Sequence, residues 1–88
     1  MQKADFTIVN RLGLHARAAA QLVQTANRFR SDITVAKDDE EVNGKSIMGI
    51  LMLAAPKGSQ ITVTTNGEDE QSAMEAVGQL ITNGFGED

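Results

Sequence analysis

The chain has 88 residues but no cysteine, tryptophan or tyrosine, only three phenylalanines and a single histidine. Without cysteine, disulfides and thiolate metal sites are excluded, and one histidine is too few for a conventional zinc site. We therefore expect neither a metal nor a cofactor. Scarce aromatic side chains offer little for stacking the bases of single-stranded nucleic acid. The net charge is −4, whereas duplex-binding proteins carry the opposite bias, so no nucleic acid partner is expected.

The sequence also lacks a long hydrophobic run. No segment approaches the length of a membrane span, and the N-terminus, MQKADFTIVN, lacks the apolar stretch of a signal peptide. We therefore expect a cytoplasmic protein that does not insert into a membrane. The length predicts a single domain, residues 1–88, with a thin core in which each apolar helix face matters.

Apolar and polar side chains alternate in three segments, as in strands with one buried face. These segments are residues 4–9, 32–37 and 60–66, and the last is the clearest of them. A further short strand is expected around Val42, after an acidic hairpin connection.

Three other segments have helical features. The first begins near Ala16 and ends near residues 27–29, with apolar positions at helical spacing. The second spans 46–54 and is expected to end because of Pro56. The third follows Asp69, which is a suitable N-cap by residue type. The order is therefore β-α-β-β-α-β-α, and the fold class is α+β, an open-faced sandwich with helices packed on one side of a single sheet.

The middle helix, SIMGILMLAAP, is apolar all the way round. Such a helix must be buried on every side or must present an apolar surface. Complete burial is difficult in so small a domain, so we expect an exposed face, and two methionines suit a surface that adapts to partners. The alternative is that the helix is central and covered on all sides.

His15 is expected at the N-cap of the first helix, after a tight turn at Gly13. The first-turn N–H groups lack acceptors within the helix, and with Arg17 they would hold an anion. We expect these positive surroundings to keep the imidazole neutral, with a lone pair that can act as a nucleophile. The residues therefore suggest that His15 carries a phosphoryl group. The alternatives are a solvated surface histidine or a mediocre helix cap.

Ser46 is a good N-cap by residue type for the middle helix. Phosphorylation there would add about −1.5 to −2 charges at a helix N-terminus, which the helix tolerates. A partner with an acidic, apolar surface would not tolerate that charge. Capping and regulation are thus compatible roles for this residue.

The motifs GLHARAA at 13–19, KSIMGILML at 45–53 and KGSQITVTTNGEDE at 57–70, with the closing helix, resemble the HPr family. This family comprises the histidine-containing phosphocarriers of the bacterial phosphoenolpyruvate-dependent sugar phosphotransferase system, and the similarity covers essentially the whole chain. The resemblance implies a four-stranded antiparallel sheet with three helices on one face. It also implies a carrier that is a substrate of other enzymes and performs no turnover of its own.

The resemblance further implies individual roles. His15 would accept phosphate on Nδ1 from phosphorylated Enzyme I and pass it to sugar-specific IIA domains. Arg17 and the backbone amides of the first helix, beginning at Ala16, would hold the phosphate. Ser46 would be the target of HPr kinase/phosphorylase and would act through a catabolite-control regulator. Partners would dock on residues of the first two helices: Ala16, Ala20, Ile47, Met48, Leu51 and Met52.

The chain departs from the family motif at Ala18, where proline is usual. Alanine keeps good helix propensity, so we expect a normal helix with a modest loss of rigidity, which affects transfer rate rather than phosphorylation itself. Two other functions remain in view. One is a regulatory module of the same fold that acts on a transcription factor or enzyme. The other is a small hydrolase that uses Ser46 or Ser59 with His15, although no nucleophile-elbow pattern is present.

Overall fold

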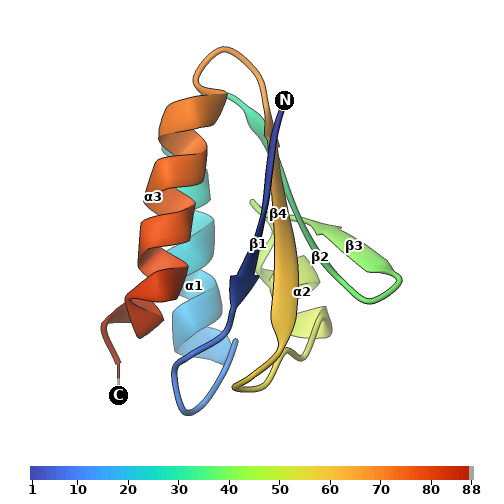
Figure 1. Ribbon diagram of the computed structural model, residues 1–88, viewed down its shortest axis with the longest axis vertical. Coiled ribbons are helices and arrows are strands. Elements are labelled where there is room, and N and C mark those ends of the chain that lie inside the picture. The colour runs from blue at the N-terminus through green and yellow to red at the C-terminus, as the bar shows by residue number, and fades with distance from the viewer. Residues whose placement is uncertain (88) are drawn as a thin grey trace.

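The computed structural model describes residues 1–87, which form one sheet and three α-helices (Figure 1). The elements are β1 (Gln2–Thr7), α1 (Ala16–Ala26), β2 (Asp32–Lys37), β3 (Glu40–Asn43), α2 (Ile47–Met52), β4 (Gln60–Asn66), α3 (Glu70–Thr82) and a 3₁₀ turn, η1 (Gly84–Gly86). All strand pairs are antiparallel, in the order β1-β4-β2-β3. The helices lie on one side of the sheet, so the predicted open-faced sandwich and element order are confirmed.

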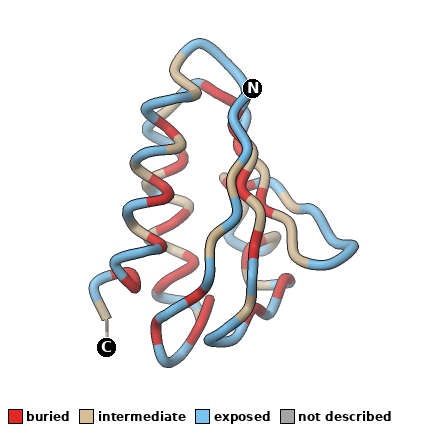
Figure 2. Tube along the Cα trace, in the orientation of Figure 1, coloured by how far each residue is buried: buried red, intermediate tan, exposed pale blue. Residues whose placement is uncertain are grey.

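The sheet has one buried and one open face, as the alternating sequence predicts. In the central strand β4, Val63 pairs with Ala4 of β1 on one side and Val35 of β2 on the other. Alternate residues of β2 and β4 are fully buried, whereas their neighbours remain accessible (Figure 2). The expected strand over 4–9 is displaced toward the N-terminus, and Ile8 lies in the core just after β1 ends.

The helices cover this face with small and branched side chains. The buried stripes of α1 and α3 are Ala18, Ala19, Leu22, Ala26, Ala73, Val77, Gly78 and Ile81. A methyl group at Gly78 would lie 2.7 Å from Cζ of Phe6, so α3 approaches β1 closely at this point. None of the helices in residues 1–87 combines the length and the apolar character needed to cross a membrane.

The structure corrects the expected end of the middle helix and the expected capping role of Asp69. The middle helix stops at Met52, before the expected residue 54, because Ala54 adopts a left-handed conformation with φ of 48°. Pro56 therefore lies beyond a helix that has already ended. Asp69 occupies the N-cap position of α3, but its side chain makes no capping hydrogen bond and instead reaches Ser31.

Candidate functional site

The loop between β1 and α1 is held in one shape by its own hydrogen bonds. Gly13 has φ of +68°, and a side chain there would place Cβ only 2.4 Å from the Ala55 carbonyl oxygen, so only glycine fits. The Asn10 side-chain amide donates to the Gly13 carbonyl at 2.8 Å. The Leu14 N–H donates to the Ala55 carbonyl at 2.9 Å, and the Leu14 side chain is buried. The residue that follows, His15, thus starts from a rigid base.

His15 is the N-cap residue of α1, as predicted. Its backbone carbonyl accepts from the Ala19 N–H at 2.8 Å, and its ring Nδ1 accepts from the Arg17 N–H at 3.3 Å. A ring nitrogen therefore replaces the hydroxyl or carboxylate oxygen that usually caps a helix. The side chain is 28% exposed, so the ring is neither buried in the core nor free in solvent.

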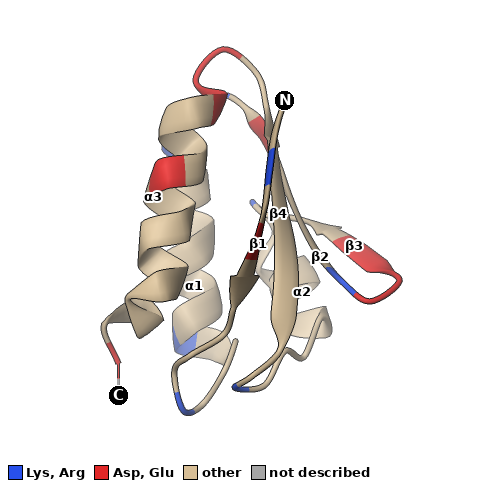
Figure 3. Cartoon of the chain, viewed as in Figure 1, with Lys and Arg blue, Asp and Glu red and all other residues tan. Residues whose placement is uncertain are grey.

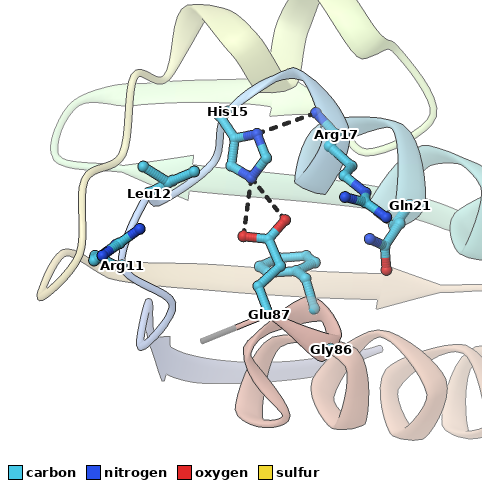
Figure 4. A pocket seen from close by; sticks show the side chains of 8 residues that line it. Arg11, Leu12, His15, Arg17, Gln21, Gly86 and Glu87 are labelled. Atoms are coloured by element: carbon cyan, nitrogen blue, oxygen red, sulfur yellow. Dashed lines mark hydrogen bonds and ion pairs between the residues drawn. The ribbon is translucent and has the colours of Figure 1, made fainter.

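Glu87 lies on the opposite edge of the same ring (Figure 4). Its carboxylate oxygens are 2.7 and 2.9 Å from Nε2 of His15, and one of them also accepts from the Asn10 side-chain amide at 3.0 Å. Burial of the Glu87 carboxylate raises its pKa, but the hydrogen bonds from Asn10 and His15, together with nearby positive charge, lower it more, and its pKa lies below the ordinary glutamate value. A carboxylate that the sequence analysis did not anticipate therefore joins the positive groups around His15.

A cleft with a volume of about 370 Å³ lies beside the His15 ring, and the side chain of Arg17 lines it. The other lining residues are Arg11, Leu12, His15, Gln21, Phe85, Gly86 and Glu87. Within residues 1–87 the structure gives the Arg17 guanidinium no hydrogen bond, so this exposed cation borders the histidine without being tied to another group. Ala16, also exposed, and the buried Ala18 complete the first turn of α1.

Ser46 caps α2 in the way its residue type predicts. Its Oγ accepts from the Gly49 N–H at 3.1 Å, and its carbonyl accepts from the Ile50 N–H at 3.0 Å. The side chain is half-buried, so the hydroxyl remains partly accessible at the start of the helix.

The apolar surface expected of α2 is present, and the alternative of a fully covered helix is wrong. Ile47, Met48 and Met52 are 41%, 67% and 65% exposed, whereas Ile50 is completely buried. Leu51 and Ala20 are half-buried. Acidic residues gather in the β2–β3 hairpin and in the turn between β4 and α3, and this turn lies at the opposite end of the molecule from the β1–α1 loop (Figure 3).

Sequence reasoning missed Glu87 and the part played by Asn10. Glu87 is 72 positions from His15 along the chain, and no local pattern connects the two. The only sequence signal is the pair of glycines around Phe85, which allows the chain to turn back after α3.

Comparison with known proteins identifies the family of the chain. The sequence profile of the PTS HPr component phosphorylation site family matches residues 2–83. Phosphocarrier protein HPr of Neisseria meningitidis is 53% identical over 87 residues, which cover 99% of this chain and 98% of the relative.

Solved structures show the same likeness. HPr-C-His from Thermoanaerobacter tengcongensis has a TM-score of 0.96 and 45% identity, with 100% of this chain and 99% of that chain covered. The solution structure of Crh, the Bacillus subtilis catabolite repression HPr, has a TM-score of 0.67 and 42% identity, and covers 91% of this chain and 95% of that one. With a profile match over nearly its whole length and a relative at 53% identity, the chain belongs to the HPr phosphocarrier family of the phosphotransferase system.

Proposed function

We propose that this chain accepts a phosphoryl group on Nδ1 of His15 from phosphorylated Enzyme I and passes it to the IIA domains of sugar permeases in the cytoplasm. The observation that supports this most directly is the contact between Nδ1 and the Arg17 N–H at the N-terminus of α1. The lone pair of Nδ1 is thereby directed at the positive end of the helix, where an anionic group is stabilised.

The chain's own residues have distinct parts in this transfer. The Nδ1 lone pair forms the bond to phosphorus, and the electron pair of the broken bond leaves with the donor. The first-turn amides, beginning at Ala16, and the Arg17 guanidinium would then hold the phosphoryl oxygens. Helix-end stabilisation of roughly 0.3–1 kcal/mol at an exposed site suits a carrier, because a group held more tightly would not be passed on.

Partners would dock beside His15 on the apolar surface of α2. Exposed methionines adapt to differently shaped surfaces, and Met48 and Met52 are both about two-thirds exposed. This docking surface comprises Ala16, Ala20, Ile47, Met48, Leu51 and Met52. Arg11 and Arg17 border the adjoining cleft, so a partner with apolar side chains next to acidic ones fits best.

Phosphorylation of Ser46 by an HPr kinase/phosphorylase would place a dianion at the edge of this docking surface. The helix N-terminus tolerates the charge, whereas an acidic partner surface is repelled by it. A catabolite-control regulator would read the same charge as a signal. The likeness to the Bacillus subtilis catabolite repression HPr supports such a regulatory role, alone or beside carriage.

Incubation with Enzyme I and phosphoenolpyruvate, followed by intact mass measurement, tests the carrier function. We expect an acid-labile gain of one phosphoryl group that is absent in His15→Ala and present in Ser46→Ala. An HPr kinase with ATP should add an acid-stable group with the opposite dependence on the two variants. If the native chain gains no acid-labile group, carriage is contradicted and the regulatory module is the better interpretation.

A further inference from the structure

The segment after α3 folds back onto the β1–α1 loop and places Glu87 beside His15. Phe85 is the anchor, because its side chain is 2% exposed and its backbone adopts φ of 58°, which reverses the chain direction. The Glu87 N–H donates to the Gly84 carbonyl at 2.9 Å, which closes the turn. Glu87 is therefore held in place by the folded turn that follows α3.

The two edges of the His15 ring face chemically different neighbours. An N–H group faces Nδ1, and an N–H can only donate, so Nδ1 must offer its lone pair. A carboxylate faces Nε2, and an ionised carboxylate can only accept, so Nε2 must carry the proton. The lowered pKa of Glu87 keeps that carboxylate ionised near neutral pH. Both contacts thus select the same tautomer of the ring.

We propose that Glu87 is a positioning residue for phosphoryl transfer at His15: its carboxylate holds the ring proton on Nε2 and turns the lone pair of Nδ1 toward the incoming phosphoryl group. This inference rests on the proposed carrier function. Glu87 does not touch the phosphoryl group in this scheme, since it contacts the other edge of the ring.

The charge balance of the transfer gives the carboxylate a second effect. When Nδ1 forms the bond to phosphorus, the bond between phosphorus and the donor breaks, and its electron pair leaves with the donor. The ring keeps its Nε2 proton and therefore becomes positively charged. Glu87, 2.7 Å from Nε2, faces this charge directly. On transfer to the next protein the electron pair returns to Nδ1, and the ring is neutral again.

The side chain of Asn10 supports this arrangement. Its side-chain Nδ2 donates to both the Gly13 carbonyl and Glu87, which fixes the orientation of the amide. The amide oxygen Oδ1 is then buried without a hydrogen-bond partner in the described residues. The donor side of the amide is thus used entirely to join Glu87 to the β1–α1 loop.

Two substitutions separate the charge of Glu87 from its packing. Glu87→Gln keeps the size and one acceptor oxygen but removes the charge, whereas Glu87→Ala removes both. Glu75→Gln is the matched control, because Glu75 is exposed on α3 and has no hydrogen bond or ion pair within residues 1–87. The rate of phosphorylation by Enzyme I is measured for all four proteins, together with thermal unfolding.

We expect the phosphorylation rate to fall roughly tenfold in both Glu87 variants, the scale of one charge-assisted hydrogen bond, and to stay at the native value in Glu75→Gln. A role in packing alone predicts that Glu87→Gln behaves like the native chain, so native rates in Glu87→Gln would overturn the proposal.

A second measurement does not depend on transfer. The ¹⁵N shifts of the His15 ring, recorded where the ring is neutral, should show the Nε2-protonated tautomer in the native chain and a larger share of the other tautomer in Glu87→Ala. Identical ring shifts in the two would also overturn the proposal. A native chain that takes up no phosphoryl group overturns the carrier function, whereas a phosphorylated chain with unchanged variant rates overturns only the role of Glu87.

Discussion

The Ser31 hydroxyl donates a hydrogen bond of 2.5 Å to Oδ1 of Asp69 and joins the start of β2 to the start of α3. The backbone N–H groups of Arg30 and Ser31 donate to the same carboxylate, each at 2.9 Å. The hydrogen bond from the Ser31 side chain is the largest cause that lowers the pKa of Asp69, from 3.8 to about 2, and the bond from Arg30 is the next. The carboxylate thus ties two segments together most strongly while it is ionised.

The free energy of unfolding should therefore depend on Asp69 at acid pH. Because the folded-state pKa is depressed, this contribution is fully present above pH 3.8 and is lost as the pH falls from about 3.8 toward 2. Urea unfolding of the native chain and Asp69→Asn across that range measures it. We expect the difference between the two proteins to shrink as the pH falls, because the native carboxylate becomes neutral as well.

Asp39→Asn is a suitable control, since Asp39 is exposed in the β2–β3 connection. The difference in free energy of unfolding between Asp39→Asn and the native chain should not shrink as the pH falls. A pH-independent difference between Asp69→Asn and the native chain would show that the hydrogen bonds, rather than the ionised state, matter.

Gly13→Ala should destabilise the fold more than Gly58→Ala. Both glycines have positive φ, which costs another residue about 1–2 kcal/mol. A Cβ at Gly13 also meets backbone atoms of Ala55 and Pro56, which adds about 1–3 kcal/mol, whereas a Cβ at Gly58 meets nothing within 4 Å. Equal urea midpoints for the two variants would contradict the close approach of the loop to residues 55–56.

Loss of the Ser46 cap should lower the free energy of unfolding by about 1 kcal/mol in Ser46→Ala. Ser46→Asp retains an acceptor for the Gly49 N–H and should remain within about 0.5 kcal/mol of the native chain. Ser72→Ala, at an exposed position on α3, controls for the residue change. If Ser46→Ala unfolds at the native urea concentration, the cap contributes nothing to stability.

Met48→Asp should weaken partner docking without loss of stability. Met48 is 67% exposed, so its substitution leaves the core intact, but a charge in an apolar contact is expected to raise the KM for this chain in the Enzyme I reaction roughly tenfold. The control, Gln71→Asp, makes a neutral residue acidic in the first turn of α3. The start of α3 lies at the opposite end of the molecule from the β1–α1 loop (Figure 1). A similar KM for both variants would place the docking surface elsewhere.

The hydrophobic periodicity of the sequence predicted the strands and helices that have one buried face. The strands 32–37 and 60–66 match β2 and β4, because burial alternates along them as their side chains do. The N-cap positions of His15 and Ser46 were also predictable, because a cap lies next to the helix it closes.

Contacts between distant segments were not predictable in the same way. Asp69 has the residue type of a cap, yet three donors from residues 30–31 outcompete its own helix for the carboxylate. The early end of α2 depends on the conformation of Ala54, which alanine rarely adopts. Glu87 belongs to no periodic pattern in the sequence, and it meets His15 only in the folded chain.

The long sequence separation of His15 and Glu87 also determines when the two residues meet during synthesis. A ribosome releases His15 72 residues before Glu87, whose carboxylate faces its Nε2, and the two side chains meet only after α3 has docked. A nascent chain therefore exposes the histidine before its counter-charge is present. The contact between the two side chains forms only once the segment after α3 has folded against the β1–α1 loop.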